Sequence, residues 1–443
     1  MNSNSELNYS NNSTQQSVLN QAAALADSNL FADYLVYENQ GECWYAGGIQ
    51  RAITVYANYI EVKIGETVKS ISVAPQDLAQ ALHEQLKQWQ GNWQVCGWAC
   101  FEFAYALHTP ELLKHGELDE KEPLLFLCEP ELSVTLRDNH YEIKTTNNAL
   151  QKQAQAILNN VTLASTLNYQ PVTVTDDPRY RDAVRKSVIA INNNELEKVI
   201  LSRKVPLHFT PDLTATWLYG LQNNTPARSF TMQLKNWKAT GFSPEIVMAL
   251  DKHGMLTTQP LAGTRRLEGD MEQDKLIFDE LLKDPKETHE HAISVRLSMD
   301  EMEQVCTPST VHVDEFMTRK LRGSVQHLAS KVRGQLKPNY NAWHAFTSLF
   351  PAVTASGIPK APAFAQICSH ELSNRGLYSG AIFKLNSEGE MDAALVLRSV
   401  LSHGDNYWLQ AGAGIVKDST PSREHTETTE KMNSISPWVV AKR

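Results

Sequence analysis

Lys198-Val-Ile-Leu-Ser-Arg-Lys-Val205 is a short apolar, β-branched run that predicts a strand, and the elements around it decide the fold class. Before it, apolar side chains recur at helical spacing and predict an amphipathic helix, at Tyr180, Val184, Val188 and Ile191. After it, three further strands are predicted at 229–234, 246–250 and 255–258, and helices resume at about 283–306. Because strands and helices do not alternate regularly, the pattern favours an α+β fold on antiparallel sheet over a doubly wound fold.

A second region of mixed strands and helices precedes this part of the chain. Apolar or alternating runs at 53–60 and 124–128 predict strands, and helical spacing at 77–89 predicts a helix. Residues 1–21 are mostly Asn, Ser and Gln, so they have too few apolar side chains to offset the entropy of ordering. A polar stretch at 159–178 predicts a linker. We therefore expect a flexible tail at 1–21, an amino-terminal region at 22–170 packed into the same body, and a carboxy-terminal region at 171–443.

Composition disfavours several classes of function. Of 443 residues, 42% are hydrophobic and 21% are charged, which is typical of a globular protein. The formal net charge of −9 provides no basic field for nucleic acid or an anionic membrane surface. Six scattered cysteines without a Cys-x-x-Cys pair indicate a reducing compartment. The first basic residue is Arg51 and no apolar run reaches the roughly 18 residues of a membrane helix, so we expect a cytoplasmic protein.

Two acidic clusters are candidates for a metal site. Glu287 and Glu290 lie three residues apart in Lys286-Glu-Thr-His-Glu-His291, and Glu424 and Glu427 repeat that spacing in Arg423-Glu-His-Thr-Glu-Thr-Thr-Glu-Lys431. Residues three apart share a helix face, where like charges repel unless a cation lies between them. Two such helices can hold one divalent ion through carboxylate oxygens, in the octahedral arrangement that Mg²⁺ prefers. A solvated acidic face, with a lysine pairing four residues on, is the commoner explanation of such spacing.

Lys198 and Glu245 are candidates for proton transfer. Lys198 begins the predicted strand, and Glu245 ends the turn Gly241-Phe-Ser-Pro-Glu245. A buried lysine can take a proton at neutral pH and a carboxylic acid can give one, so the two can act as general base and general acid. A solvated strand-end lysine and an ordinary turn are the commoner explanation. The chain has no Walker motif, no Gly-x-Gly-x-x-Gly after a strand and no Gly-x-Ser-x-Gly elbow, so nucleotide hydrolysis and serine-hydrolase chemistry are unsupported.

Six motifs occur in one order, at Lys198-Val-Ile-Leu-Ser-Arg203, Gly241-Phe-Ser-Pro-Glu245, Pro260-Leu-Ala-Gly-Thr-Arg265, Lys286-Glu-Thr-His-Glu-His291, Ala411-Gly-Ala-Gly-Ile-Val416 and Arg423 to Lys431. Together they resemble the chorismate-utilising enzymes, the family of anthranilate, aminodeoxychorismate, isochorismate and salicylate synthases. The likeness covers about 180–442, and Gly97-Trp-Ala-Cys-Phe-Glu-Phe103 extends it to all but the tail. It implies the anthranilate-synthase-like chorismate-binding fold, with large antiparallel sheets surrounded by helices.

Within this family, three longer phrases resemble the salicylate synthases of siderophore pathways: Asn224-Thr-Pro-Ala-Arg-Ser-Phe230, Arg322-Gly-Ser-Val-Gln-His-Leu328 and Leu349-Phe-Pro-Ala-Val-Thr-Ala-Ser-Gly-Ile-Pro-Lys360. Lys198 stands where ammonia-using relatives usually carry glutamine, and Ala262 stands where aminodeoxychorismate synthases carry a nucleophilic lysine. The resemblance therefore implies a water-adding member that needs no glutamine amidotransferase subunit. A monomer is the family expectation.

The resemblance also implies roles for individual residues. Lys198 would deprotonate water attacking the ring of chorismate while Glu245 protonates the departing hydroxyl, and isochorismate would then lose pyruvate to give salicylate. Mg²⁺ would be held by Glu290 and Glu427, with Glu287 and Glu424 acting directly or through water. Tyr378 and Arg398 would bind the enolpyruvyl carboxylate. The residues that the motifs assign to substrate binding are Gly263, Thr264, His327, Thr354, Tyr378, Arg398, Gly412 and Lys431.

Two other functions remain open at this stage. The first is an isochorismate synthase that releases the intermediate. The second, from a different class, is a chorismate-binding paralogue without catalysis. The presence of Lys198, Glu245 and all four glutamates argues against the paralogue.

Overall fold

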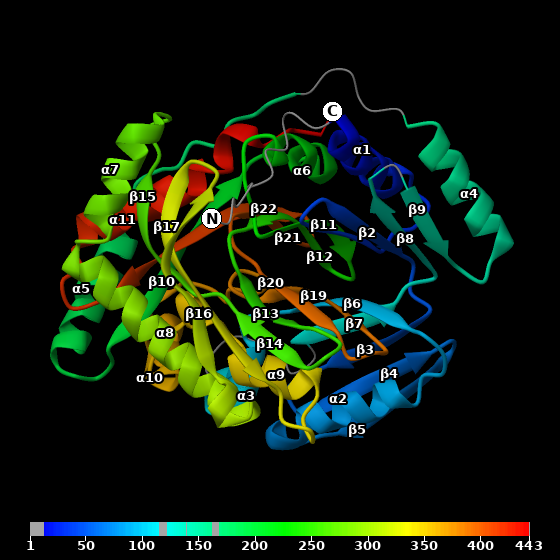
Figure 1. Cartoon of the computed structure of the whole chain (residues 1–443), viewed down its shortest axis with the longest axis horizontal. Helices are drawn as coiled ribbons and strands as arrows, with labels where there is room; N and C mark the ends of the chain where they lie inside the picture. The colour runs from blue at the N-terminus through cyan, green and yellow to red at the C-terminus, as the bar shows by residue number, and fades with distance from the viewer. Residues whose placement is uncertain (1–12, 115–121, 139, 162–167, 443) are drawn as a thin grey trace.

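Two large antiparallel sheets pack face to face in this computed structural model, which describes residues 13–114, 122–138, 140–161 and 168–442 (Figure 1). Strands from both ranges, 22–170 and 171–443, enter each sheet. Neighbouring strands pair antiparallel throughout the described residues. The predicted α+β architecture is confirmed.

The first sheet has ten strands in the described residues. In spatial order they are β18 (Gly357–Ile358), β10 (Lys198–Leu207), β22 (Asn406–Ile415), β21 (Ser399–His403), β12 (Trp237–Ser243), β11 (Arg228–Leu234), β1 (Tyr34–Asn39), β2 (Glu42–Gly47), β8 (Leu132–Arg137) and β9 (His140–Lys144).

The second sheet has twelve strands in the same described residues. In spatial order they are β15 (Leu261–Arg266), β17 (Val325–Gln335), β14 (Met255–Thr258), β13 (Ile246–Leu250), β20 (Met391–Leu395), β19 (Ala381–Asn386), β6 (Gln94–Ala99), β7 (Leu125–Glu129), β3 (Arg51–Val55), β4 (Tyr59–Ile64) and β5 (Thr67–Ser72), with β16 (His312–Arg322) paired to β17. The run at 53–60, predicted as one strand, is split between β3 and β4, because the chain turns at 56–58 and β3 pairs with β4 as a hairpin.

Helices cover the outer faces of both sheets (Figure 1). On the ten-stranded sheet, α1 (Ser13–Asp27), α4 (Asn148–Asn159) and α6 (Leu213–Leu221) pack over the strands from β12 to β9. On the same sheet, α5 (Pro178–Asn192), α10 (Lys360–His370) and α11 (Pro421–Asn433) contact β10 or β22. The other described helices are α2 (Leu78–Lys87), α3 (Phe103–His108), α7 (Met271–Leu281), α8 (Pro285–Val305) and α9 (Ala342–Leu349). Single 3₁₀ turns lie at Pro75–Asp77, Pro110–Lys114, Pro308–Thr310, Val353–Ala355 and Ser436–Trp438. No helix in these described ranges is long and apolar enough to cross a membrane.

The core between the sheets is rich in aromatic side chains. Trp98 of β6 is 1% exposed and lies beside Phe126 of its own sheet and Trp237 of the other. A fully buried large apolar side chain contributes roughly 1.5–3 kcal/mol to folding. The strands from the amino-terminal third therefore form one core with the strands that follow them.

The predicted tail is wrong for residues 13–21, which form the first part of α1. Val18 and Leu19 are each 1% exposed, and with Ala22 and Leu25 they pack against the ten-stranded sheet. The prediction relied on the mostly polar composition of residues 1–21 and overlooked these apolar positions. Their helical spacing is enough to form one buried helix face. Residues 1–12 of the predicted tail and 162–167 of the predicted linker lie outside the described residues.

Candidate active site

A cavity lies where β10, β15, β22, α8 and α11 meet. It brings together twelve of the fourteen residues that the sequence proposes for the site. These are Lys198, Glu245, Gly263, Thr264, Glu290, His327, Thr354, Tyr378, Arg398, Gly412, Glu427 and Lys431. The other two, Glu287 and Glu424, do not line the cavity but lie beside Glu290 and Glu427 on the same two helices.

Lys198 is completely buried, so it is not a solvated strand-end lysine. Its Nζ lies 3.0 Å from Oε1 of Glu290 and donates a 3.0 Å hydrogen bond to Oγ of Ser294. Both partners come from α8, one turn apart. Gly414 of β22 makes this possible, because a Cβ there would lie 2.1 Å from Oε1 of Glu290.

Glu245, between β12 and β13, is 3% exposed. Its Oε1 accepts a 2.8 Å hydrogen bond from Thr354 and its Oε2 accepts a 2.9 Å bond from the backbone N–H of Leu261. Burial raises the pKa of Glu245 to about 7 against these opposing hydrogen bonds. A carboxyl group with such a pKa can hold and release a proton near neutral pH, as a general acid must.

Arg398 is a buried, positively charged residue in the wall of the cavity. Its Nη1 donates to the carbonyl of Arg322 (2.8 Å) and its Nη2 to Nε2 of His327 (2.7 Å). A guanidinium only donates, so His327 carries its proton on Nδ1, which donates to Oγ1 of Thr264 (3.0 Å). Burial and the adjacent Arg398 hold the pKa of His327 well below its usual range. The partners of Arg398 in the described chain are thus neutral, and an anion in the cavity would supply the missing negative charge.

Tyr378 and Lys431 line the same cavity. Lys431 donates to the carbonyl of Gly412 (2.9 Å) and pairs with Glu427 (2.7 Å). A Cβ at Gly412 would lie 3.1 Å from Oη of Tyr378, so the glycine makes room for the tyrosine hydroxyl.

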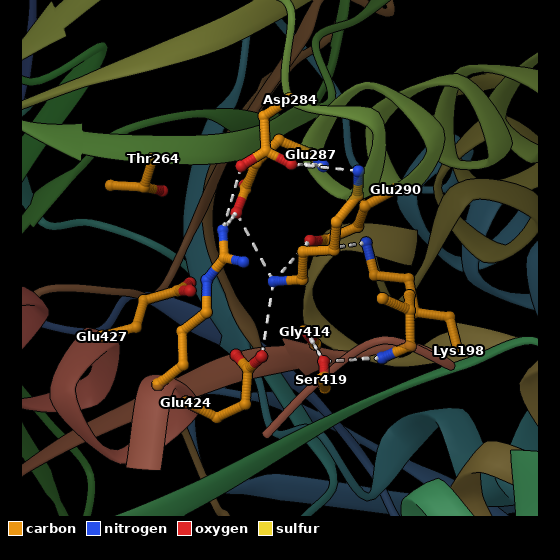
Figure 2. A network of polar contacts seen from close by, with 12 residues as sticks. Lys198, Thr264, Asp284, Glu287, Glu290, Gly414, Ser419, Glu424 and Glu427 are labelled. Atoms are coloured by element: carbon orange, nitrogen blue, oxygen red, sulfur yellow. Dashed lines mark hydrogen bonds and ion pairs between the residues drawn. The ribbon is translucent and has the colours of Figure 1, made fainter. Parts of the chain in front are cut away.

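The two glutamate pairs face each other across the gap between α8 and α11 (Figure 2). Glu287 is 2%, Glu290 7% and Glu424 0% exposed, so the predicted spacing does not mark a solvated acidic face. Burial, aided by the neighbouring Glu427, raises the pKa of Glu424 to about 7. Against burial, the ammonium groups of Lys431 and Lys286 lower the pKa of Glu427 to about 2. Several buried glutamates from α8 and α11 thus lie close together. Their mutual repulsion has to be offset by cations nearby.

Three of these cations were not singled out from the sequence. Lys286 lies 3.3 Å from Glu424, 3.5 Å from Glu287 and 3.7 Å from Glu290. Arg423 pairs with Glu287 and Asp284, and Arg265 pairs with the same two carboxylates. All three belong to the quoted motifs, and their opposite charge beside glutamates was the signal that could have revealed them.

The donors of the cluster suit a divalent cation, although the side chains are arranged around lysine. Glu424 is fully buried, and neither of its carboxylate oxygens takes a hydrogen bond from the described residues. Four carboxylates on two helices are the oxygen donors that Mg²⁺ prefers. Among the described residues, no group of three His, Cys, Asp or Glu side chains is placed to hold a metal ion. The donor atoms are thus of the kind that Mg²⁺ prefers, but Lys286 lies between them and the carboxylates are not gathered around an ion.

Two curated proteins of known activity are similar to this chain over most of its length. The chain is 36% identical to the salicylate synthase of Mycolicibacterium paratuberculosis over 93% of its own length and 90% of the relative. It is 30% identical to anthranilate synthase component 1 of Lactococcus lactis, over 70% of each chain.

Two solved structures share the fold. Anthranilate synthase component I from Streptococcus pneumoniae superposes with a TM-score of 0.72 at 23% identity, covering 89% of this chain and 92% of the other. The menaquinone-specific isochorismate synthase from Escherichia coli gives 0.71 at 21% identity, covering 95% and 90%. The chorismate binding enzyme family matches residues 33–437. The chain belongs to that family.

Proposed function

We propose that this protein is a salicylate synthase, which converts chorismate into isochorismate by addition of water and then into salicylate and pyruvate, with Mg²⁺ bound. The observation that carries the proposal is that two groups suited to proton transfer line the same cavity. These are the buried lysine Lys198 and the carboxyl group of Glu245, whose pKa is raised to about 7. Lys198 in place of the glutamine of ammonia-using relatives, and Ala262 in place of a nucleophilic lysine, support the addition of water.

In the first step, the amine of Lys198 takes a proton from water as the water oxygen bonds to the ring carbon beside the carboxylate. The ring double bonds shift, the hydroxyl bond at the far carbon breaks, and Glu245 gives its proton to that leaving group. The leaving group departs as water, so the product is an isomer of chorismate. Glu245 is suited to this role because burial keeps its carboxyl group partly protonated at neutral pH.

Chorismate is a dianion, and the cavity offers separate positive groups for its two carboxylates. Arg398 has no carboxylate partner in the described chain and presents a planar fork, which suits the enolpyruvyl carboxylate. Tyr378 and Lys431 lie on the same wall. His327 orients Arg398 and is held by Thr264, so these two act as positioning residues.

The ring carboxylate would lie toward the glutamate cluster. Glu290 and Glu427 would hold Mg²⁺, with Glu287 and Glu424 bound directly or through water. The ion supplies the positive charge that neutralises and orients the ring carboxylate. Gly414 keeps Glu290 close to the cavity, as described above.

The second step asks less of the side chains. The hydrogen on the newly hydroxylated ring carbon moves to the methylene carbon of the enolpyruvyl group while the ether bond breaks, leaving salicylate and pyruvate. A pericyclic transfer of this kind needs a held conformer and a dry pocket. Apolar side chains on the cavity wall, at Ile200, Leu261 and Leu409, support such a pocket.

The 36% identity to a salicylate synthase over nearly the whole chain favours this activity over its alternatives. We propose further that the protein acts in the cytoplasm as a monomer without a glutamine amidotransferase subunit, and that the salicylate enters siderophore synthesis. Ammonium and glutamine should then leave the product unchanged.

The test is incubation of the purified protein with chorismate and Mg²⁺, followed by salicylate fluorescence and a separate measurement of pyruvate. We expect both products in equal amounts and none in excess chelator. Isochorismate as the only product would contradict the proposal in favour of an isochorismate synthase. No consumption of chorismate would contradict it in favour of a binding protein.

A further inference from the structure

Among the described residues, Lys286 is the one lysine that lies among three glutamates of the cluster. Its side chain is 5% exposed, and its Nζ lies 3.3–3.7 Å from Glu287, Glu290 and Glu424, which come from both helices. Its amine is the shared cation of these three ion pairs. A positive charge thus already occupies the space between the carboxylates.

With every group ionised, the formal charges of the cluster cancel without any further ion. Five carboxylates contact five cations through ion pairs, namely Asp284, Glu287, Glu290, Glu424 and Glu427 with Lys198, Arg265, Lys286, Arg423 and Lys431. A divalent ion would add two positive charges at a buried place. Because an uncompensated buried charge is costly, binding of the ion favours loss of one existing positive charge, either by withdrawal of a side chain or, at Lys198, by loss of the proton that its role as a base requires.

The contacts indicate which cation withdraws. Lys198 donates a 3.0 Å hydrogen bond to Ser294, and Lys431 donates a 2.9 Å hydrogen bond to the carbonyl of Gly412. These hydrogen bonds fix the positions of the two lysines. Arg265 and Arg423 bind from the partly exposed side, through Asp284 and Glu287. Lys286 makes no hydrogen bond to the described residues, although its Nζ is buried. Its amine is therefore held only by electrostatic attraction to the glutamates. An incoming cation competes for the same carboxylates.

We propose that Lys286 is an internal counter-ion, which keeps the four glutamates together when no divalent ion is bound and gives up its place when one binds. This inference rests on the proposed metal site, although not on the proposed reaction. Lysine in this position makes the protein stable without metal, and it weakens metal binding. Removing its charge should reverse both effects.

The test is calorimetric titration of the full chain with MgCl₂ in the absence of substrate, comparing wild type with Lys286→Met, whose side chain is similar in length and uncharged. We expect Lys286→Met to bind Mg²⁺ at least about tenfold more tightly, because a competing charge a few ångströms away is gone. Its Tm without metal should fall below that of wild type, and Mg²⁺ should raise its Tm by more than it raises the wild-type Tm.

Two further variants serve as controls. Lys283→Met removes an exposed lysine just before the same helix and should bind Mg²⁺ as wild type does. Lys286→Arg keeps the charge and should not gain affinity, which also provides a test if Lys286→Met folds only with Mg²⁺ present. Recovery of a folded Lys286→Met by Mg²⁺ would itself support the inference.

Three outcomes would overturn it. Unchanged or weaker Mg²⁺ binding by Lys286→Met, beside measurable wild-type binding, would mean that Lys286 does not compete with the ion. A Tm lowered equally with and without Mg²⁺ would mean that the lysine is only structural. No Mg²⁺ binding by any variant would remove the metal site and this inference with it, while salicylate formation from chorismate would still be judged by its own assay.

Discussion

Glu245 combines two features, a buried carboxyl group and a place in the wall of the candidate active site. Its hydrogen bonds from Thr354 and Leu261 favour the ionised form, and burial outweighs them. The residue is therefore set to change protonation state in the physiological range, which connects a single side chain to the pH dependence of the whole reaction.

The chorismate reaction should lose rate as pH rises through about 7, because Glu245 must be protonated to act as an acid and its pKa is raised to about 7. The profile of kcat/KM reports the free enzyme, so it is the quantity to measure. Thr354→Val removes a hydrogen bond that lowers this pKa, and should move the falling limb to higher pH. With isochorismate as substrate this limb should be absent. A chorismate profile that is flat from pH 6 to 9 would contradict the acid role.

Glu290→Gln and Glu427→Gln should each weaken Mg²⁺ binding and turnover while the fold is kept, because each removes an oxygen charge facing the cavity. Titration of activity with MgCl₂ measures the effect. Glu303→Gln, on the exposed side of α8, is the matched control and should titrate like wild type. If both cavity variants keep the wild-type Mg²⁺ dependence, the assignment of these ligands is wrong.

Residue by residue, the sequence could predict which glutamates share a face but not what lies between them. The i, i+3 spacing depends only on helix geometry, so it is visible in Lys286 to His291 and in Arg423 to Lys431. The position of Lys286 among both pairs depends on how α8 packs against α11, which is a tertiary contact. The same limit applies to Arg398 and His327, whose hydrogen bond joins residues 71 positions apart.

Among the elements, the loop that holds Tyr378 depends on a motif near the other end of the chain. Glu102, in the motif beginning at Gly97, accepts hydrogen bonds from the backbone N–H groups of Arg375 (2.7 Å) and Gly376 (3.1 Å). Arg375, which is 1% exposed, donates to the carbonyls of Ala355 and Ile200 behind the cavity. The amino-terminal motif therefore supports the wall of the site without entering it.

Glu102→Ala should destabilise the protein by about 1–3 kcal/mol, because two buried N–H groups lose their acceptor. It should also raise KM for chorismate more than it lowers kcat, since the role proposed for Tyr378 is substrate binding and not proton transfer. Denaturant unfolding and steady-state kinetics measure the two effects. Glu102→Gln keeps one acceptor oxygen and should be intermediate. Wild-type stability and KM in Glu102→Ala would show that this connection has no role.

Elements with strong local patterns could be predicted, and those that depend on pairing could not. The apolar stripe from Tyr180 to Ile191 became α5, and the run from Lys198 became β10, because both patterns are local. The order of strands in the sheets could not be predicted from the sequence. β1 pairs with β11, and β6 pairs with β19, which follows nearly 290 residues later. Such pairings are fixed by side-chain packing between sheets, which no short window of sequence contains.

On the scale of the whole molecule, α1 shows how a polar segment joins the body. Its buried face packs against the ten-stranded sheet and against α4 and α6. Leu19→Ala should therefore cost about 2–5 kcal/mol in unfolding free energy, as for other buried leucines. Ser17→Ala, two residues earlier and partly exposed, should change it by less than about 0.5 kcal/mol. Equal unfolding midpoints for Leu19→Ala and wild type would mean that this helix is not part of the cooperative unit.

One cavity is proposed to perform two reactions, of which only the first needs Lys198 and Glu245 for proton transfer. The most direct measurement compares salicylate formation by Lys198→Ala from chorismate and from supplied isochorismate, both with Mg²⁺. Lys204→Ala, on the same strand but with its amine bound to Ser373 and Asn374, controls for loss of a lysine from β10. We predict that Lys198→Ala loses chorismate turnover by about 10²- to 10⁴-fold and keeps most of its turnover of isochorismate. Wild-type turnover of chorismate by Lys198→Ala, or equal loss with both substrates, would contradict the account.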